Sequence, residues 1–350
     1  MKISSAAGGT EAHGGGVDDL EFTSLANPSR DVCESLSRLD PRNPFCTREY
    51  LAARGESGTA VWMLGLRRGA EWVAGCAAFV STGRLNRGLE IESYPLLESG
   101  EAVFTSGLAA FCEQQGVSRL TLDTFASPAG VSVPQFPGET SRAARKEFLL
   151  DLCAAELWPA LASNHKRRIK AAEKAGVTIR AADKNTAVRE HVQLIEETFD
   201  RRKERGETVP EEIDPAPLEA FVASGAARIF QACLADRVLS SILVLRSPAA
   251  GYYQTAGNSP EGLSAGASHL LVYRVAQTLR SESAEVFNLG GVSEHNPGLV
   301  RFKESFGAAA VELEAAEFDV GPAWKKAVTS MAGLVRRGSA TFRKLGSAKS

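Results

Sequence analysis

The chain has 350 residues, of which 44% are hydrophobic and 23% charged, and its formal net charge is −2. This composition excludes a collagen, a low-complexity polymer and a wholly disordered chain. The near-neutral charge excludes a generic nucleic-acid binder, so any basic surface must be local. The length suggests about two domain-sized units with their own hydrophobic cores. The longest apolar runs are shorter than the ~18–20 residues needed to cross a bilayer.

Six cysteines are scattered along the chain, without a CxxC pair or a His/Cys cluster. This spacing argues against a metal site and is typical of reduced thiols in the cytoplasm, the localisation that we expect. Residues 1–20 are rich in Gly, Ser and Ala and lack the apolar segment of a secretory signal. We therefore expect a disordered leader.

The first half predicts one mixed α/β module, residues 21–150. Helical spacing over residues 30–51 is interrupted by Pro41 and Pro44. After it the patterns predict a hairpin (60–68 and 71–82), a helix (107–116), a strand (118–125) and a Pro/Gly-rich loop (127–138).

A connecting segment, residues 151–182, joins this module to a second one, residues 183–321. The connection is predicted as a strand beginning at residue 146, a basic helix over 155–176 and a strand over 177–182. The second module then has a helix (186–206), an acidic linker, strands within 227–247 and 251–257, a helix (267–282) and a strand (284–291). The predicted fold is α/β (mixed α+β), with two tandem modules that each form a mixed sheet flanked by helices.

The most informative segment is FNLGGVSEHNPGLVRFKESFG, residues 287–307. Its strand contains Asn288 and ends in Gly290 and Gly291, which permit close approach of a ligand or of backbone. Lys303 lies between two aromatic residues, Phe302 and Phe306, where an ammonium can act on developing negative charge. The alternative is that both phenylalanines are core residues and the lysine is solvated.

A second segment leads from a strand, through a Gly/Ser loop, into a helix. The strand carries Tyr253 and Asn258, and Gly262, Gly266 and Ser268 line the entrance to the helix. Helix N-termini offer free N–H groups to phosphates or carboxylates, so we expect substrate binding here. The alternative is an ordinary capped loop.

Two basic segments are candidates for contact with phosphates. Lys166, Arg167 and Arg168 project from the helix before Gly176, whereas the cluster over 201–205 has the pattern of an exposed helix end. The tail, residues 322–350, has seven basic and no acidic residues at roughly helical spacing, which is typical of an amphipathic helix on an anionic membrane or on nucleic acid. Each segment could equally be a solvated surface.

Three stretches together resemble the Fem family of aminoacyltransferases and the wider GNAT superfamily. They are the segment 146–179 with its R-x-I-x-x-A-x-x-x-G ending, the helix entrance 262–277, and FK-x-x-FG at 302–307 after a Gly-Gly strand. The likeness covers residues 145–320 well and residues 30–145 in outline. It implies two GNAT-like modules with substrates in a cleft between or beside them.

The resemblance also implies a reaction: an acceptor amine attacks an ester or thioester directly, without an acyl-enzyme. Lys303 would stabilise the oxyanion, Phe302 would exclude water, and Asp123, at the strand end where the family often has an aspartate, would be the base. The donor is aminoacyl-tRNA or acyl-CoA, with no permanently bound cofactor, and the acceptor is an amine of a peptidoglycan precursor or a natural product. Leu263 replaces the Gln or Arg of the GNAT pyrophosphate loop, which favours the tRNA donor.

Two other functions remain open at this point. One is an acyl-CoA-dependent N-acetyltransferase of polysaccharide or small-molecule biosynthesis. The other is a catalytically inactive GNAT-like module that binds tRNA or a membrane. We expect a monomer, with membrane association through the tail.

Overall fold

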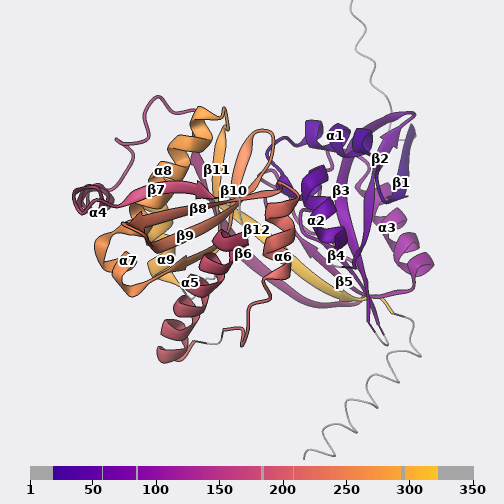
Figure 1. Cartoon of the computed structure of the whole chain (residues 1–350). Coiled ribbons are helices and arrows are strands. Elements are labelled where there is room, and N and C mark those ends of the chain that lie inside the picture. Colours follow the sequence, from indigo (N-terminus) through magenta and orange to yellow (C-terminus); the bar gives the residue numbers. More distant parts are fainter. Residues whose placement is uncertain are drawn as a thin grey trace, which may run out of the picture.

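A single mixed sheet of twelve strands runs through the computed structural model, which describes residues 19–56, 58–83, 86–182, 185–207, 209–292 and 296–321 (Figure 1). The strand order is β1-β2-β3-β4-β5-β12-β6-β11-β10-β9-β8-β7, and helices flank the sheet. The predicted α/β fold class is confirmed. The leader up to residue 18 and the tail from residue 322 lie outside the described residues.

The first half begins with a strand that the sequence patterns did not indicate. The strand β1 (Leu20–Ala26) pairs antiparallel with β2 (Ala60–Arg68). The remaining elements of this half are α1 (Arg30–Leu39), η2 (Pro44–Cys46), α2 (Arg48–Glu56), β3 (Glu71–Thr82), β4 (Arg87–Ile91), α3 (Glu101–Gln115) and β5 (Val117–Asp123). The break between α1 and α2 and the hairpin of β2 and β3 are as predicted.

The second half follows the predicted order, and its described residues form three short helices beyond the two predicted ones. Its elements are β7 (Thr178–Ala182), α5 (Asn185–Glu204), α6 (Ala216–Ala223), β8 (Ala227–Leu234), β9 (Arg237–Arg246), β10 (Ala250–Asn258), α7 (Pro260–Ala265), α8 (Ala267–Ser281), β11 (Val286–Val292) and α9 (Pro297–Glu304). The predicted Gly/Ser loop contains α7, because Ser259 caps it and Pro260 occupies its first turn.

Two predicted helix boundaries were wrong. The basic helix α4 spans Ser163–Lys174 and not 155–176, since Pro159 cannot donate a hydrogen bond inside a helix. The helix α3 begins at Glu101 and passes through Gly107, where a Cβ atom would lie 2.1 Å from Cγ of Phe22. That glycine lets β1 pack against the middle of the helix.

Strands β6 (Glu139–Asp151) and β12 (Ala309–Asp319) join the two halves at the centre of the sheet. They pair antiparallel from Ala309–Leu149 to Phe318–Glu139. On the other side, β12 pairs with β5 of the first half and β6 pairs with β11 of the second. The last strand in the chain order therefore completes the sheet of the first half.

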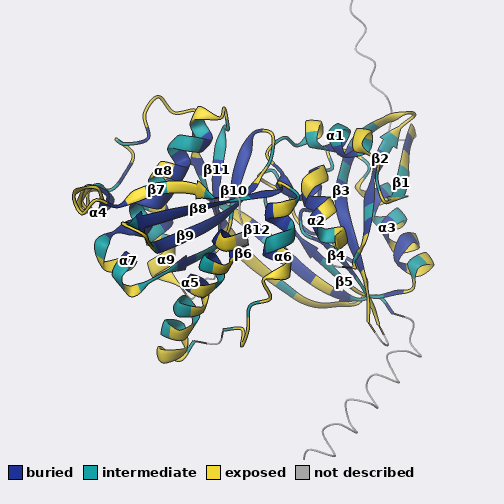
Figure 2. Cartoon of the chain, viewed as in Figure 1, coloured by how far each residue is buried: buried dark blue, intermediate teal, exposed yellow. Residues whose placement is uncertain are grey.

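Buried side chains lie along these strands, whereas the outer faces of the helices are exposed (Figure 2). One cluster of buried residues belongs to both halves: Tyr50 stacks on Phe221 with ring centroids 5.1 Å apart, and Phe45 meets Tyr252 at 5.3 Å. The halves thus share a core. No helix in the described ranges is long and apolar enough to span a membrane.

Candidate functional site

The sheet opens between β10 and β11. These strands pair in parallel only from Ala250–Val286 to Tyr252–Asn288. Beyond that point β10 continues beside β9, with a bulge between Tyr253 and Thr255, and β11 continues beside β6. The equivalent parallel pair of the first half, β4 and β5, stays joined and is extended by a bridge from Ser93 to Thr124.

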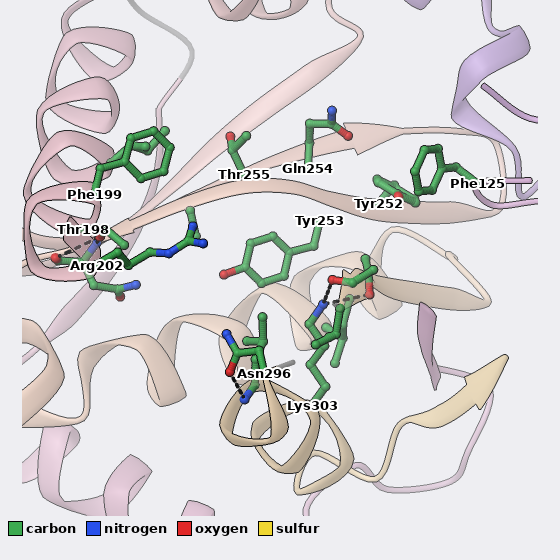
Figure 3. Close-up of a pocket in the computed structure, with 18 of the residues that line it drawn as sticks. Phe125, Thr198, Phe199, Arg202, Tyr252, Tyr253, Gln254, Thr255, Asn296 and Lys303 are labelled. Carbon is green, nitrogen blue, oxygen red and sulfur yellow. Dashed lines mark hydrogen bonds between the residues drawn. The ribbon is translucent and has the colours of Figure 1, made fainter. Parts of the chain in front are cut away.

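A cavity of about 710 Å³ occupies this opening (Figure 3). Its walls come from α5, β10, β11 and α9, and the first half closes one end with Phe45, Glu92 and Phe125. The size and the mixed polar and apolar lining are typical of a site that binds a small molecule or the reacting end of a larger substrate. Both halves of the chain therefore contribute to the candidate site.

Lys303 is held inside this cavity. Asn296 accepts a hydrogen bond from the Leu299 N–H and caps α9, and Lys303 follows on the face that points into the opening. Its side chain is only 4% exposed, and its Nζ donates to the carbonyls of Gly290 at 2.7 Å and Gly291 at 2.9 Å. A solvated lysine is therefore excluded.

Burial lowers the pKa of Lys303 to about 8, and the nearby Glu147 carboxylate opposes that shift. The amine is consequently still cationic at neutral pH, although far easier to deprotonate than an exposed lysine. A buried cation at the wall of a cavity interacts strongly with a developing anion, because little water screens it.

The paired glycines, Gly290 and Gly291, let the backbone adopt the turn that directs their carbonyls toward the Lys303 amine. Gly290 has a φ of +75°, and a Cβ atom there would lie 2.7 Å from the carbonyl oxygen of Tyr253. Asn288 fixes this turn by accepting the Gly290 N–H at 2.8 Å. Of the two alternatives predicted for these glycines, a close ligand or close backbone, the structure shows close backbone at Gly290.

Tyr253 and Asn258 of β10, for which the sequence predicted a role in substrate binding, both line the cavity. The Tyr253 phenol points into the opening, and its ring stacks on Phe287 (Figure 3). Burial raises the pKa of Tyr253, so the phenol stays neutral. The side chain of Asn258 accepts a hydrogen bond from Ser240 at 2.6 Å, which fixes its orientation.

The basic cluster over 201–205, interpreted from the sequence as an exposed helix end that could help to supply a basic approach for tRNA, contributes to the cavity wall. Arg201, Arg202 and Arg205 all line it. Arg201 donates to the Asn258 carbonyl and to Thr198, whereas Arg202 and Arg205 share Glu207 at 2.7 Å each. Three arginines within five residues were the available signal, but the sequence did not show which way their side chains point.

Glu92 is a cavity residue that the sequence analysis missed. Its carboxylate accepts from the Tyr50 hydroxyl at 2.7 Å and from Arg54 at 2.9 Å. Burial raises its pKa to about 7, with Arg54 opposing the shift. It comes from the first half, more than two hundred positions before Lys303, and no local pattern marks it.

Asp123 and Phe302 lie outside the cavity lining. Asp123 pairs with Arg145 at 3.3 Å, and burial raises its pKa to about 6. Phe302 packs with His165, His269 and Phe306 in an aromatic cluster that anchors α9. The ring near the Lys303 amine is Phe148, 5.8 Å away, because neighbouring residues of a helix point in different directions.

The basic helix α4 also lies away from the cavity. Lys166 donates to the Pro159 carbonyl and Arg168 to the Ser264 carbonyl, while Arg167 is exposed. These three residues therefore do not meet Lys303 in this structure.

Two glycines of the helix entrance pack closely against the protein's own backbone. A Cβ atom on Gly262 would lie 2.2 Å from the Leu239 carbonyl oxygen, and one on Gly266 would lie 2.7 Å from that of Arg168. Ser268 is buried beside His269. None of these three residues lines the cavity, and among residues 262–268 only Leu263 does.

Comparison with known proteins identifies the architecture. Residues 160–304 match the family model of the acetyltransferase (GNAT) domain. Among solved structures, FemX is 12% identical with a TM-score of 0.63, covering 83% of this chain and 96% of FemX. A tandem GNAT protein from the clavulanic acid biosynthesis pathway is 12% identical with a TM-score of 0.51. The match covers 87% of this chain and 99% of the tandem GNAT protein.

A third similar structure, L-PGS from Bacillus licheniformis, is 13% identical with a TM-score of 0.50. The match covers 85% of this chain and 93% of the L-PGS chain. No curated protein matches the sequence significantly. At such low identity the structural likenesses establish a shared fold.

Proposed function

Starting from the GNAT/Fem-type fold of this chain, we propose that it is an acyltransferase that moves an activated acyl or aminoacyl group onto an amine inside the cavity between β10 and β11. One observation carries the proposal: the strands separate to open a cavity, and the buried Lys303 amine is fixed at its wall. This arrangement suits stabilisation of an oxyanion.

The proposed step is direct attack of the free amine on the ester or thioester carbonyl. A C–N bond forms, the C–O or C–S bond to the carrier breaks, the nitrogen loses a proton and the leaving oxygen or sulfur gains one. The Lys303 cation stabilises the tetrahedral oxyanion. The products are an amide and the free carrier, with no covalent enzyme intermediate.

We assign the role of base to Glu92 in place of Asp123. Glu92 lines the cavity, and a pKa of about 7 suits a group that accepts a proton at neutral pH. Its carboxylate retains acceptor capacity beyond the bonds from Tyr50 and Arg54.

The arginines of α5 favour a donor or acceptor that carries phosphate. Arg201 and Arg202 of α5 and Arg205 of the turn after it line the cavity, and guanidinium groups recognise phosphate oxygens in pairs. The packed helix entrance disfavours a pyrophosphate of acyl-CoA at Gly262–Ser268. We therefore favour aminoacyl-tRNA as donor and an amine of a peptidoglycan precursor or natural product as acceptor.

A donor screen tests the class of reaction. Purified protein is incubated with charged tRNA or acyl-CoA pools and amine acceptors, and transfer is followed by mass spectrometry. Turnover with acyl-CoA and insensitivity to RNase would establish the acetyltransferase alternative. Binding without turnover of any donor would establish the inactive-module alternative.

Lys303→Met tests the site, because methionine keeps the length of the side chain and removes the charge. We expect transfer to fall by about 10²–10³-fold, the usual loss when one oxyanion partner is removed. The exposed Lys146, which pairs with Glu312, gives the matched control Lys146→Met. Equal activity of the two variants, with unchanged thermal unfolding, would refute the role of Lys303.

A further inference from the structure

A second buried charge, the Glu147 carboxylate, lies close to the site and has no part in the proposed chemistry. It is 2% exposed, in the middle of β6. It accepts hydrogen bonds from the Tyr252 hydroxyl at 2.6 Å, from Asn288 Nδ2 at 2.7 Å and from the Ala126 N–H at 3.1 Å. It therefore connects β6, β10 and β11 with a loop of the first half.

Burial has the largest effect on Glu147 and raises its pKa overall, and its hydrogen-bond partners oppose that rise. All three groups donate to Glu147. A protonated carboxyl would carry an O–H donor of its own, so one of the three groups would lose its acceptor. Burial raises the pKa of Glu147, and the hydrogen bonds from Tyr252, Asn288 and Ala126 lower it. A carboxylate surrounded by donors is stabilised in its anionic form.

Asn288 links this anion to the lysine. Its Nδ2 donates to Glu147, and its Oδ1 accepts the Gly290 N–H at 2.8 Å. The Gly290 carbonyl in turn accepts from Lys303 Nζ at 2.7 Å. A continuous chain of hydrogen bonds thus runs from Glu147 through two residues of β11 to the amine.

The other charged and titratable groups near Lys303 do not replace Glu147. Glu92, Tyr253 and the arginines of α5 line the same cavity, and Arg301 and Glu304 of α9 are exposed. Glu147 is the described carboxylate whose field counteracts the effect of burial on the lysine. A buried cation and a buried anion that compensate each other are strongly coupled.

We propose that Glu147 is a positioning residue, which through Asn288 and Gly290 fixes the Lys303 amine at the cavity wall and keeps it protonated. The expected effect of Glu147 on kcat rests on the proposed acyl transfer. The effect on the lysine itself does not, so the two ideas can fail separately.

The primary test uses the substrate-free protein. Lysine labelled with ¹³C at Cε reports each amine by NMR, and the signal that is absent from Lys303→Met identifies Lys303. We expect Glu147→Gln to lower the pKa of Lys303 by about one unit, as loss of a nearby opposite charge does. Glu312→Gln, the same change on the exposed neighbouring strand, should leave it unchanged.

Two further variants separate charge from position. Glu147→Asp keeps the charge on a shorter side chain, so the pKa of Lys303 should stay near that of the wild type while kcat falls. Asn288→Ala keeps both charges and breaks the chain, so kcat should again fall, by about tenfold or more, with KM little changed. These variants also provide a test if Glu147→Gln does not fold.

An unchanged pKa of Lys303 in folded Glu147→Gln would overturn the proposal. So would full kcat in both Glu147→Asp and Asn288→Ala. Absence of any acyl transfer in the wild type, combined with the expected shift in Glu147→Gln, would refute the proposed function and retain the link between Glu147 and Lys303.

Discussion

At the scale of single residues, the cavity contains two groups that titrate close to neutrality for the same physical reason. Burial raises the pKa of the Glu92 carboxyl to about 7 and lowers that of the Lys303 amine to about 8. In both cases loss of water disfavours the charged form. The proposed reaction needs both charged forms together, since Glu92 must accept a proton and Lys303 must remain a cation.

The pH dependence of transfer should accordingly be bell-shaped. We expect kcat/KM to rise as Glu92 ionises near pH 7 and to fall as Lys303 loses its proton near pH 8. Glu92→Gln should remove the rising limb and keep the falling one. A profile that is flat from pH 6 to 9 would contradict these assignments.

His191 offers a test of stability that is independent of activity. It is fully buried between Ser241 and Thr255, each 2.8 Å from a ring nitrogen, and burial lowers its pKa from 6.5 to about 4. The unfolded chain binds a proton first as the pH falls. The stability that His191 contributes is therefore complete above about pH 6.5 and is lost toward pH 4.

The measurement is the free energy of unfolding of the wild type minus that of His191→Gln, across this pH range. The difference cancels the opposite pH dependence of Glu92 and Asp123, whose pKa values are raised. We expect the difference to shrink as the pH falls from 6.5 to 4. A constant difference would show that His191 titrates normally.

At the scale of elements, the turn in β11 controls the site. Gly290 adopts a left-handed φ, and its neighbour across the opening is the Tyr253 backbone. Any side chain there strains the backbone and also pushes β10 and β11 apart. The geometry of the two carbonyls that hold Lys303 depends on this glycine.

Gly290→Ala should destabilise the protein by more than about 2 kcal/mol, through left-handed strain combined with a steric clash. Gly116→Ala is the matched control, because Gly116 also has a positive φ and a Cβ atom there meets nothing within 4 Å. It should cost only about 1 kcal/mol. If chemical denaturation gave the same loss of unfolding free energy for both variants, the Tyr253 backbone would have to move away from the new methyl group at little cost.

At the scale of the whole molecule, β6 and β12 make the two halves mutually dependent. Phe318 of β12 is 1% exposed and packs on Phe136 in the first half, although its strand follows the entire second half in the chain. The shared cluster of Tyr50 and Phe221 adds a second connection. We expect the halves to unfold together.

Phe318→Ala should therefore cost about 3–5 kcal/mol, as large-to-small changes in a core do, and should weaken both halves. Hydrogen exchange followed by mass spectrometry would compare peptides around Trp62 of β2 in the first half with peptides around Phe230 of β8 in the second. Faster exchange in both would agree with this expectation. Faster exchange in the first half alone would show that the halves unfold independently.

Local sequence patterns were enough to predict most helices and strands and the mixed α/β class, and to single out Lys303 as a candidate site residue. Those features depend on local periodicity, on helix breakers such as Pro41 and Pro44, and on a short motif around one lysine. The three-dimensional arrangement was needed to show that Glu92 and the arginines at the end of α5 share a cavity with Lys303, and that Asp123 and Phe302 lie outside it. It was also needed to show that Gly262 and Gly266 pack against backbone. The physical reason is that these features are contacts between residues far apart in the chain. Strand pairing and the direction of each side chain determine such contacts, and a local sequence pattern records neither of these two factors.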